Sequence, residues 1–179
     1  MASLKAFAAE IAAIVGSTPA AVYERQRALI RAGIFPEPES RGRGHGLEAL
    51  PETVAILLIA LLATDSMSET DERVGALAKA RFDDITKPKC ELTGTSRFGD
   101  ALTAILQSKE IASRVWRVEV SRTSARATIW FRRGRNIHQS NFGNERAMRM
   151  MPAIEVEAKL SDFAIRNIMT ALKRWRGVP

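Results

Sequence analysis

The feature that most constrains the fold is Gly16, which separates two helical patterns. Before it, apolar residues recur at spacings of three and four, which predicts an amphipathic helix over residues 3–15. After it, Ser17 or Thr18 can cap a second helix, because a hydroxyl accepts from the free N–H groups of a first turn. We expect that second helix to end at Gly33. The sequence thus predicts two helices joined by a tight turn.

Ala12, Gly16 and Val22 give this stretch an A-x3-G-x5-V spacing. A helix-turn-helix needs a small residue where its helices touch, a glycine at the turn and an apolar anchor under the second helix. The spacing therefore favours a DNA-binding helix-turn-helix. The alternative interpretation is an ordinary helical hairpin in a bundle, which uses the same residue types.

A segment rich in proline and glycine follows. Residues 36–46 contain two prolines and three glycines in eleven positions, so they cannot continue a helix. Arg41, Arg43 and His45 alternate with these glycines and predict a solvent-exposed basic loop. Alternatively, such a loop binds other anions, because glycines let the backbone approach them closely. After the loop, Pro51 opens a strongly apolar helix that runs to about Ala63.

The first 80 or so residues resemble the DNA-binding region of MerR-type and other winged helix-turn-helix regulators. The resemblance implies that the second helix enters the major groove and that the basic loop is a wing touching the backbone or minor groove. The long coiled dimerisation helix of that family is missing, so a phage or mobile-element regulator with the same module is the closer match. The residues that carry the resemblance are Gly16, the cap Ser17, Thr18 and Pro19, then Tyr23, Arg25, Arg27, Gly33–Pro36, Arg41–Gly46 and the helices expected over residues 51–63 and 69–81.

One face of the second helix is polar and supplies the candidates for DNA contact. Gln26 and Arg27 are the candidates for base reading, because glutamine can pair with adenine and arginine with guanine. Thr18, Tyr23 and Arg31 are expected to touch phosphate. A solvated face with Glu24 paired to Arg27 is the alternative. The candidate DNA-binding residues of the whole chain are Thr18, Ala20, Tyr23, Gln26, Arg27, Arg31, Arg41, Arg43, His45, Arg132, Arg133 and Arg135.

The second half of the chain changes in character. Alternating apolar and polar residues predict strands over 115–121 and 127–132, with a possible third over 153–158. Helices are expected over 98–108 and from the cap Ser161 to Arg174, with Phe163, Ile165, Ile168, Met169 and Leu172 inward. The predicted fold is therefore mainly α with a small α+β part. Its expected domains are a winged helix-turn-helix over 1–82, a linker over 83–96 and an α+β dimerisation or interaction module over 97–179.

Positive charge is concentrated in this second half. The net charge is +7, and residues 111–179 alone carry 14 basic and 5 acidic side chains. Because a guanidinium pairs bidentately with phosphate, this excess favours a polyanionic partner. Arg132 ends the second predicted strand, and Arg133 and Arg135 follow in a polar loop expected over residues 133–147; together they are a second candidate contact with nucleic acid. A basic loop without a ligand, or an oligomer contact, is the alternative.

Other functional classes find little support in the sequence. Two histidines far apart make no metal pair, and Cys90 is the single cysteine, which excludes an internal disulfide. No nucleophile motif is present, so we expect neither an enzyme nor a cofactor. The longest apolar run, residues 54–63, is half the length of a membrane span, and no export signal is evident. We therefore expect a cytoplasmic protein.

Together these features predict a sequence-specific transcriptional regulator that binds double-stranded DNA in the nucleoid. A homodimer is expected, because one recognition helix reads few base pairs. The C-terminal module would dimerise, contact DNA, or recruit RNA polymerase or another DNA-binding protein. The alternatives are a DNA-packaging or recombination accessory protein, of small-terminase or excisionase type, and an adaptor that binds no nucleic acid.

Overall fold

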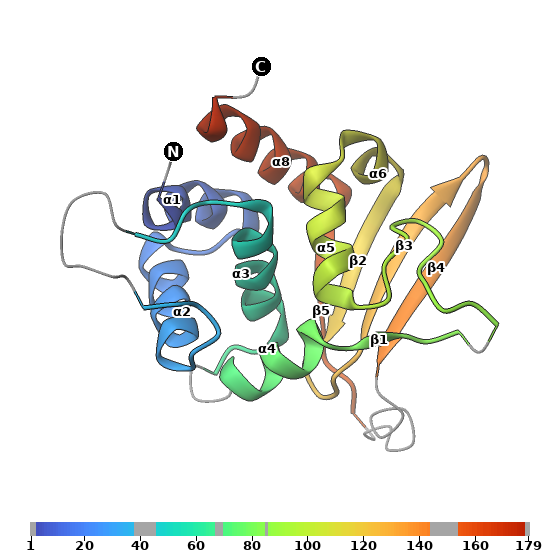
Figure 1. The fold of residues 1–179 in the computed structure, drawn as a ribbon, viewed down its shortest axis with the longest axis horizontal. Helices are drawn as coiled ribbons and strands as arrows, with labels where there is room; N and C mark the ends of the chain where they lie inside the picture. The colour runs from blue at the N-terminus through green and yellow to red at the C-terminus, as the bar shows by residue number, and fades with distance from the viewer. Residues whose placement is uncertain (1–2, 38–45, 67–69, 85, 144–153, 178–179) are drawn as a thin grey trace.

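The computed structural model describes residues 3–37, 46–66, 70–84, 86–143 and 154–177. Figure 1 shows a group of N-terminal helices packed beside an antiparallel sheet and its covering helices. The helices are α1 (Leu4–Val15), α2 (Pro19–Arg31), α3 (Pro51–Ala63), α4 (Thr70–Ala78), α5 (Phe98–Gln107), α6 (Lys109–Arg114) and α8 (Asp162–Arg176). The strands are β1 (Arg81–Phe82), β2 (Val115–Ser121), β3 (Ala127–Arg133), β4 (Asn136–Gly143) and β5 (Glu157–Ser161).

The first two helices and their turn lie where the sequence predicted them. Gly16 ends α1 with φ of 70°, a left-handed conformation that costs glycine little. The Thr18 hydroxyl accepts a hydrogen bond from the Ala21 amide at 3.1 Å and so caps α2. Ala12 and Val22 are fully buried where the helices pack. The expected wing falls largely outside the described residues, and its described flanks, 34–37 and 46–50, form no hairpin.

Helix α3 is the centre of the N-terminal group. Val54, Leu57, Leu58 and Ile59 are at most 1% exposed, because α2, α4, α5 and the sheet surround the helix. Helix α4 ends three residues earlier than predicted, and the chain then forms the short strand β1.

The sheet is larger than the sequence indicated. Its five strands are all antiparallel, in the order β1-β4-β3-β2-β5. The fold is therefore mixed α+β, about half helical, and not mainly α with two or three strands. Strand β4 occupies residues expected to form a polar loop, and β5 begins at Glu157 and not at Ala153.

The two faces of the sheet differ. Val118, Ile129, Phe131 and Leu160 point to the helices and are at most 4% exposed. The opposite face carries polar and aromatic side chains. On α8 the predicted inward residues are buried except Phe163, which is 68% exposed and whose predicted burial is wrong. Position 163 lies on the same side of α8 as Arg166 and Thr170, three and seven residues later, which are also exposed.

One hydrophobic core joins the two halves of the chain. It runs without a break from α1 to α8, and helix α3 packs on α5. The segment expected to be a linker contributes to it: Cys90 is 1% exposed and its thiol donates to the Ser140 hydroxyl on β4 at 3.2 Å. Most of the other described residues of 83–96 are exposed, and the domain boundary predicted there stays a prediction.

Helix α8 also reaches the first helix. The Trp175 indole and the Arg174 guanidinium both donate to the Glu10 carboxylate on α1. The Trp175 ring lies edge-on to Phe7, with 6.2 Å between ring centroids. These contacts close the fold between its first and last described helices.

Candidate nucleic-acid interface

Helix α2 lies at the margin of the molecule, on the side away from the sheet (Figure 1). Packing against α1, α3 and α4 covers one side of the helix and leaves the other to solvent. Thr18, Ala20, Arg27 and Arg31 are all exposed on it. Tyr23 is half-buried, with the Lys5 ammonium 5.0 Å from the centre of its ring. We call Thr18, Ala20, Tyr23, Arg27 and Arg31 the α2 surface.

The arginine at the middle of this surface is held only loosely. The Arg27 guanidinium lies 3.1 Å from the Glu24 carboxylate one turn earlier, and the two side chains are 53% and 44% exposed. An exposed pair of this kind contributes at most about 1 kcal/mol. Arg27 can therefore exchange Glu24 for another anion at small cost.

Gln26 does not lie on the exposed face where the sequence placed it. It is 6% exposed, and its Oε1 atom has no hydrogen-bond partner in the described part of the chain. Helix α2 contacts three helices, α1, α3 and α4. A larger part of its circumference is therefore buried than its apolar residues alone predict. Of the two candidates for base reading, Arg27 is the exposed one.

The neighbouring Arg25 is buried as well, at 7% exposure. Its guanidinium donates to the Ser66 backbone carbonyl at 3.0 Å and so ties α2 to the chain after α3. Burial lowers the pKa of Arg25, an effect that the nearby Asp65 carboxylate opposes. Arg25 therefore positions α2 from its inner side.

None of the other predicted contacts that the structure describes joins the α2 surface. Arg41, Arg43 and His45 lie outside the described residues. Arg132, Arg133 and Arg135 are exposed around the β3–β4 turn, where Gly134 has φ of 62°. That turn lies at the end of the molecule furthest from α2 (Figure 1). Arg133 is paired with Glu91, so this second basic group is separate and partly engaged.

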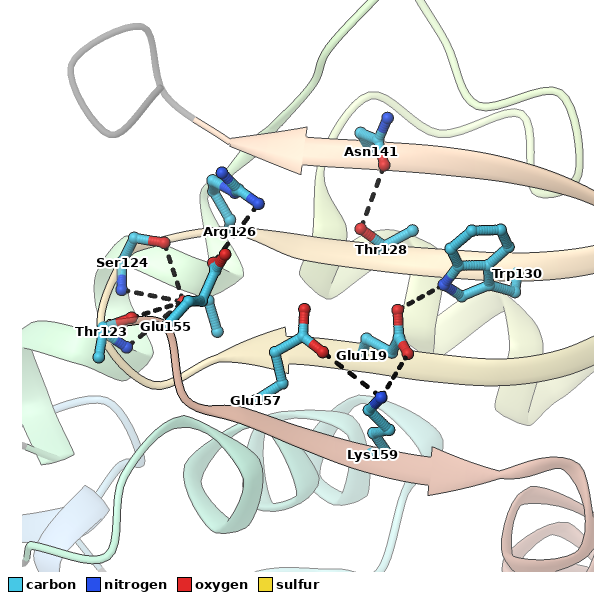
Figure 2. A network of polar contacts seen from close by, with 11 residues as sticks. Glu119, Thr123, Ser124, Arg126, Thr128, Trp130, Asn141, Glu155, Glu157 and Lys159 are labelled. Atoms are coloured by element: carbon cyan, nitrogen blue, oxygen red, sulfur yellow. Dashed lines mark hydrogen bonds and ion pairs between the residues drawn. The ribbon is translucent and has the colours of Figure 1, made fainter. Parts of the chain in front are cut away.

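Sequence reasoning missed a polar network on the helix-free face of the sheet. Glu119 on β2 is 7% exposed and accepts from the Trp130 indole at 2.5 Å. It also pairs with the Lys159 ammonium at 3.2 Å and the Arg117 guanidinium at 3.0 Å. Figure 2 shows Glu119 between β3 and β5, with Trp130 on one side and Lys159 on the other.

This network is tightly coupled. Arg117 lies over Trp130 and Trp116, at 5.0 and 4.4 Å from the two ring centres. Hydrogen bonding to Glu119, and its charge, raise the pKa of Lys159 above its ordinary value. The alternating pattern of β2 contained a signal for this network, because it places Arg117 and Glu119 on one face of the strand. The register with β3 then places Trp130 beside them.

Comparison with known proteins adds no relative: no family model, curated protein or solved structure matches the chain. Among the described residues, no helix has the length and apolar character needed to cross a bilayer. The same residues include no cluster of three or more His, Cys, Asp or Glu side chains suited to a metal ion.

Proposed function

We propose that this protein binds double-stranded DNA through the α2 surface and acts as a sequence-specific transcriptional regulator. The observation that carries the proposal is the α1–α2 unit. Its left-handed Gly16 and capped second helix are features that a helix-turn-helix needs, and no other element of the described part of the chain covers its outer face. Arg27 and Arg31 project from that face, where a guanidinium can pair with guanine or with phosphate.

The charge of the chain agrees with this proposal. A net charge of +7 attracts a polyanion, and the two arginines of the α2 surface, Arg27 and Arg31, are exposed. The basic β3–β4 turn lies too far from α2 to touch the same base pairs, so it would contact flanking DNA or a second partner. A homodimer remains our expectation, with two α2 helices reading two half-sites.

The direct test is duplex binding by the variant Arg27→Ala/Arg31→Ala. We expect its affinity for the preferred duplex to fall at least tenfold in fluorescence anisotropy. The slope of log affinity against log salt should fall in magnitude by up to about two. Arg166→Ala is the matched control, because Arg166 is also an exposed helical arginine in an ion pair, with Asp162. Equal affinities of the double variant and wild type would overturn the proposal.

A DNA-packaging or recombination accessory role uses the same surface and is the alternative. Crosslinking, immunoprecipitation and sequencing across the genome separates the two. Peaks at several promoters support regulation, whereas a single packaging or attachment site supports the alternative.

A further inference from the structure

Strand β4 forms most of one edge of the sheet. It pairs with β3 along nearly its whole length, whereas on its other side β1 pairs only with Phe142 and Gly143. The Asp83 amide adds one further hydrogen bond there, to the Asn141 carbonyl at 2.8 Å. Within the described part of the chain, no backbone group bonds to residues 136–139 from that side. We call residues 136–139 the β4 edge.

The backbone of the β4 edge is directed outward at alternate residues. Because the Asn141 carbonyl accepts from Asp83, Asn141 directs its backbone groups away from β3. Successive residues of an antiparallel strand direct these groups to opposite sides, so Ile137 and Gln139 also direct theirs outward. Both side chains are exposed, and that of the apolar Ile137 is 51% exposed. An edge with these features is a template for another strand.

Opposite charges mark the two ends of the β4 edge. At its start lies the β3–β4 turn, where Arg132 and Arg135 are exposed. At its other end lie Asp83 and Asp84, which are exposed as well. Among the described residues, the side chains of Arg132, Arg135 and Asp83 have no hydrogen bond or ion pair. Arg81 on β1 lies opposite Gly143 and is further from the edge than Asp83.

We infer that the β4 edge binds the β4 edge of a second copy of this chain, in antiparallel orientation. An antiparallel occupant complements the charges if it is acidic beside the turn and basic beside Asp83. The β4 edge of a second copy has this order, because a twofold axis brings Arg135 of each copy toward Asp83 of the other. A twofold interface uses the same patch on both subunits, so it requires such self-complementarity.

The chain that follows β1 fixes the register of this pairing. Asp83 already lies opposite Asn141, so a second strand has room only beside residues 136–139. Pairing Ile137 with Ile137 of the second copy meets this limit, because the turn of that copy then lies beside Gln139. Two outward-directed residues opposite each other form a hydrogen-bonded pair, with about 5.5 Å between their Cα atoms. The two exposed isoleucines then pack side by side.

The pairing is short, so we expect a weak dimer with a dissociation constant in the micromolar range. The β3–β4 turn lies furthest from α2, so the two α2 surfaces come to opposite ends of the dimer (Figure 1). If α2 binds DNA as proposed, its two half-sites are therefore well separated. The dimer itself does not depend on DNA, and the two proposals can fail separately.

The first test is cysteine cross-linking in the full chain. Cys90, the single native cysteine, is 1% exposed, so an introduced surface cysteine is the reactive one. A disulfide needs Cα atoms about 4.4–6.8 Å apart, which the Ile137 pair meets. We expect Ile137→Cys to form a covalent dimer under a mild oxidant, seen on a non-reducing gel. Gln139→Cys is the matched control and should stay monomeric, because it lies opposite Arg135 and not opposite a second Gln139.

The second test reverses charges at the two ends of the edge. Arg135→Glu and Asp83→Arg should each weaken self-association at least about fivefold, because each sets like charges against each other at both contacts. An equimolar mixture of the two variants should associate again, since both contacts then join opposite charges. Analytical ultracentrifugation at low salt, where screening is weak, measures this. Arg166→Glu is the control, since Arg166 is an exposed arginine on α8, and it should leave self-association unchanged.

Three results overturn the inference. The first is a wild-type chain that stays monomeric up to millimolar concentration. The second is equal cross-linking of Ile137→Cys and Gln139→Cys. The third is a mixture of the two charge variants that associates no better than either variant alone, which would assign the edge to a different partner. Circular dichroism confirms that each variant is folded, and duplex binding is measured separately.

Discussion

The α2 surface and the helix-free face of the sheet are both rich in cations, but they hold them differently. On α2, Arg27 has one exposed partner, Glu24. On the sheet, Lys159 and Arg117 share the nearly buried Glu119, and two tryptophans flank Arg117. The first arrangement leaves a cation available to a ligand. The second uses cations to satisfy a buried carboxylate, so we interpret it as structural.

The largest expected effect is that of Glu119→Ala. Removing the carboxylate leaves Trp130, Lys159 and Arg117 without their shared acceptor. We expect the free energy of unfolding to fall by about 3 kcal/mol, toward the low end for a broken buried pair because Lys159 is half exposed. Urea denaturation measures it. Glu24→Ala is the control and should cost no more than about 0.5 kcal/mol. Equal losses of unfolding free energy in Glu119→Ala and Glu24→Ala would contradict the proposed difference between the two regions.

Trp130→Phe tests the same network more gently. The ring and its packing remain, while the hydrogen bond from the indole to Glu119 is lost. A hydrogen bond to a charged group contributes about 1.5–3 kcal/mol, and we expect a loss near the lower figure because Lys159 still satisfies Glu119. Chemical denaturation followed by circular dichroism suits this variant. A loss as large as that of Glu119→Ala would mean that ring packing, and not the hydrogen bond, is what matters.

Glu24→Ala tests whether Arg27 on the α2 surface is available to a ligand. It frees Arg27 and removes a negative charge from the surface proposed to meet phosphate. Affinity for duplex DNA should therefore rise about threefold at low salt, and the gain should shrink as salt screens the charges. Anisotropy titrations at two salt concentrations measure this. Weaker binding would indicate that Glu24 positions Arg27 and does not compete for it.

The smallest expected effect is a change in stability at high pH. Folding raises the pKa of Lys159 above its ordinary value of 10.5. Its contribution is therefore complete below about pH 10.5 and is lost as the pH rises through the folded-state pKa. Thermal unfolding of wild type and Lys159→Met at about pH 9 and about pH 11.5 should show a difference that narrows at the higher pH. Lys173→Met is the matched control, and a constant difference would contradict this coupling.

Local signals in the sequence predicted much of the backbone. Gly16, Thr18 and Ser161 mark helix ends, and their conformations and cap hydrogen bonds lie as expected. Strands β2 and β3 follow from alternation in VWRVEVS and ATIWFR. These signals depend on residues close together in the sequence, so they can be recognised without knowledge of the tertiary structure.

What could not be predicted depends on distant neighbours. In β4 the inward position 140 is a serine, because Cys90 from a distant segment supplies its partner. That strand therefore lacks the apolar alternation of its neighbours. Similarly, Gln26 is buried by helices beyond the hairpin. The candidate α2 surface was predicted except for Gln26.

The link between α8 and α1 bears on how the protein is made. Glu10 meets Trp175 across 165 positions of sequence. On a ribosome, the helix that supports α2 lacks these contacts until nearly all of the described chain has been synthesised. Pairings over such separations also slow folding, because a long loop must close before they form. A nascent chain that stalls before residue 175 would thus present an incompletely anchored α1, with α2 packed against it.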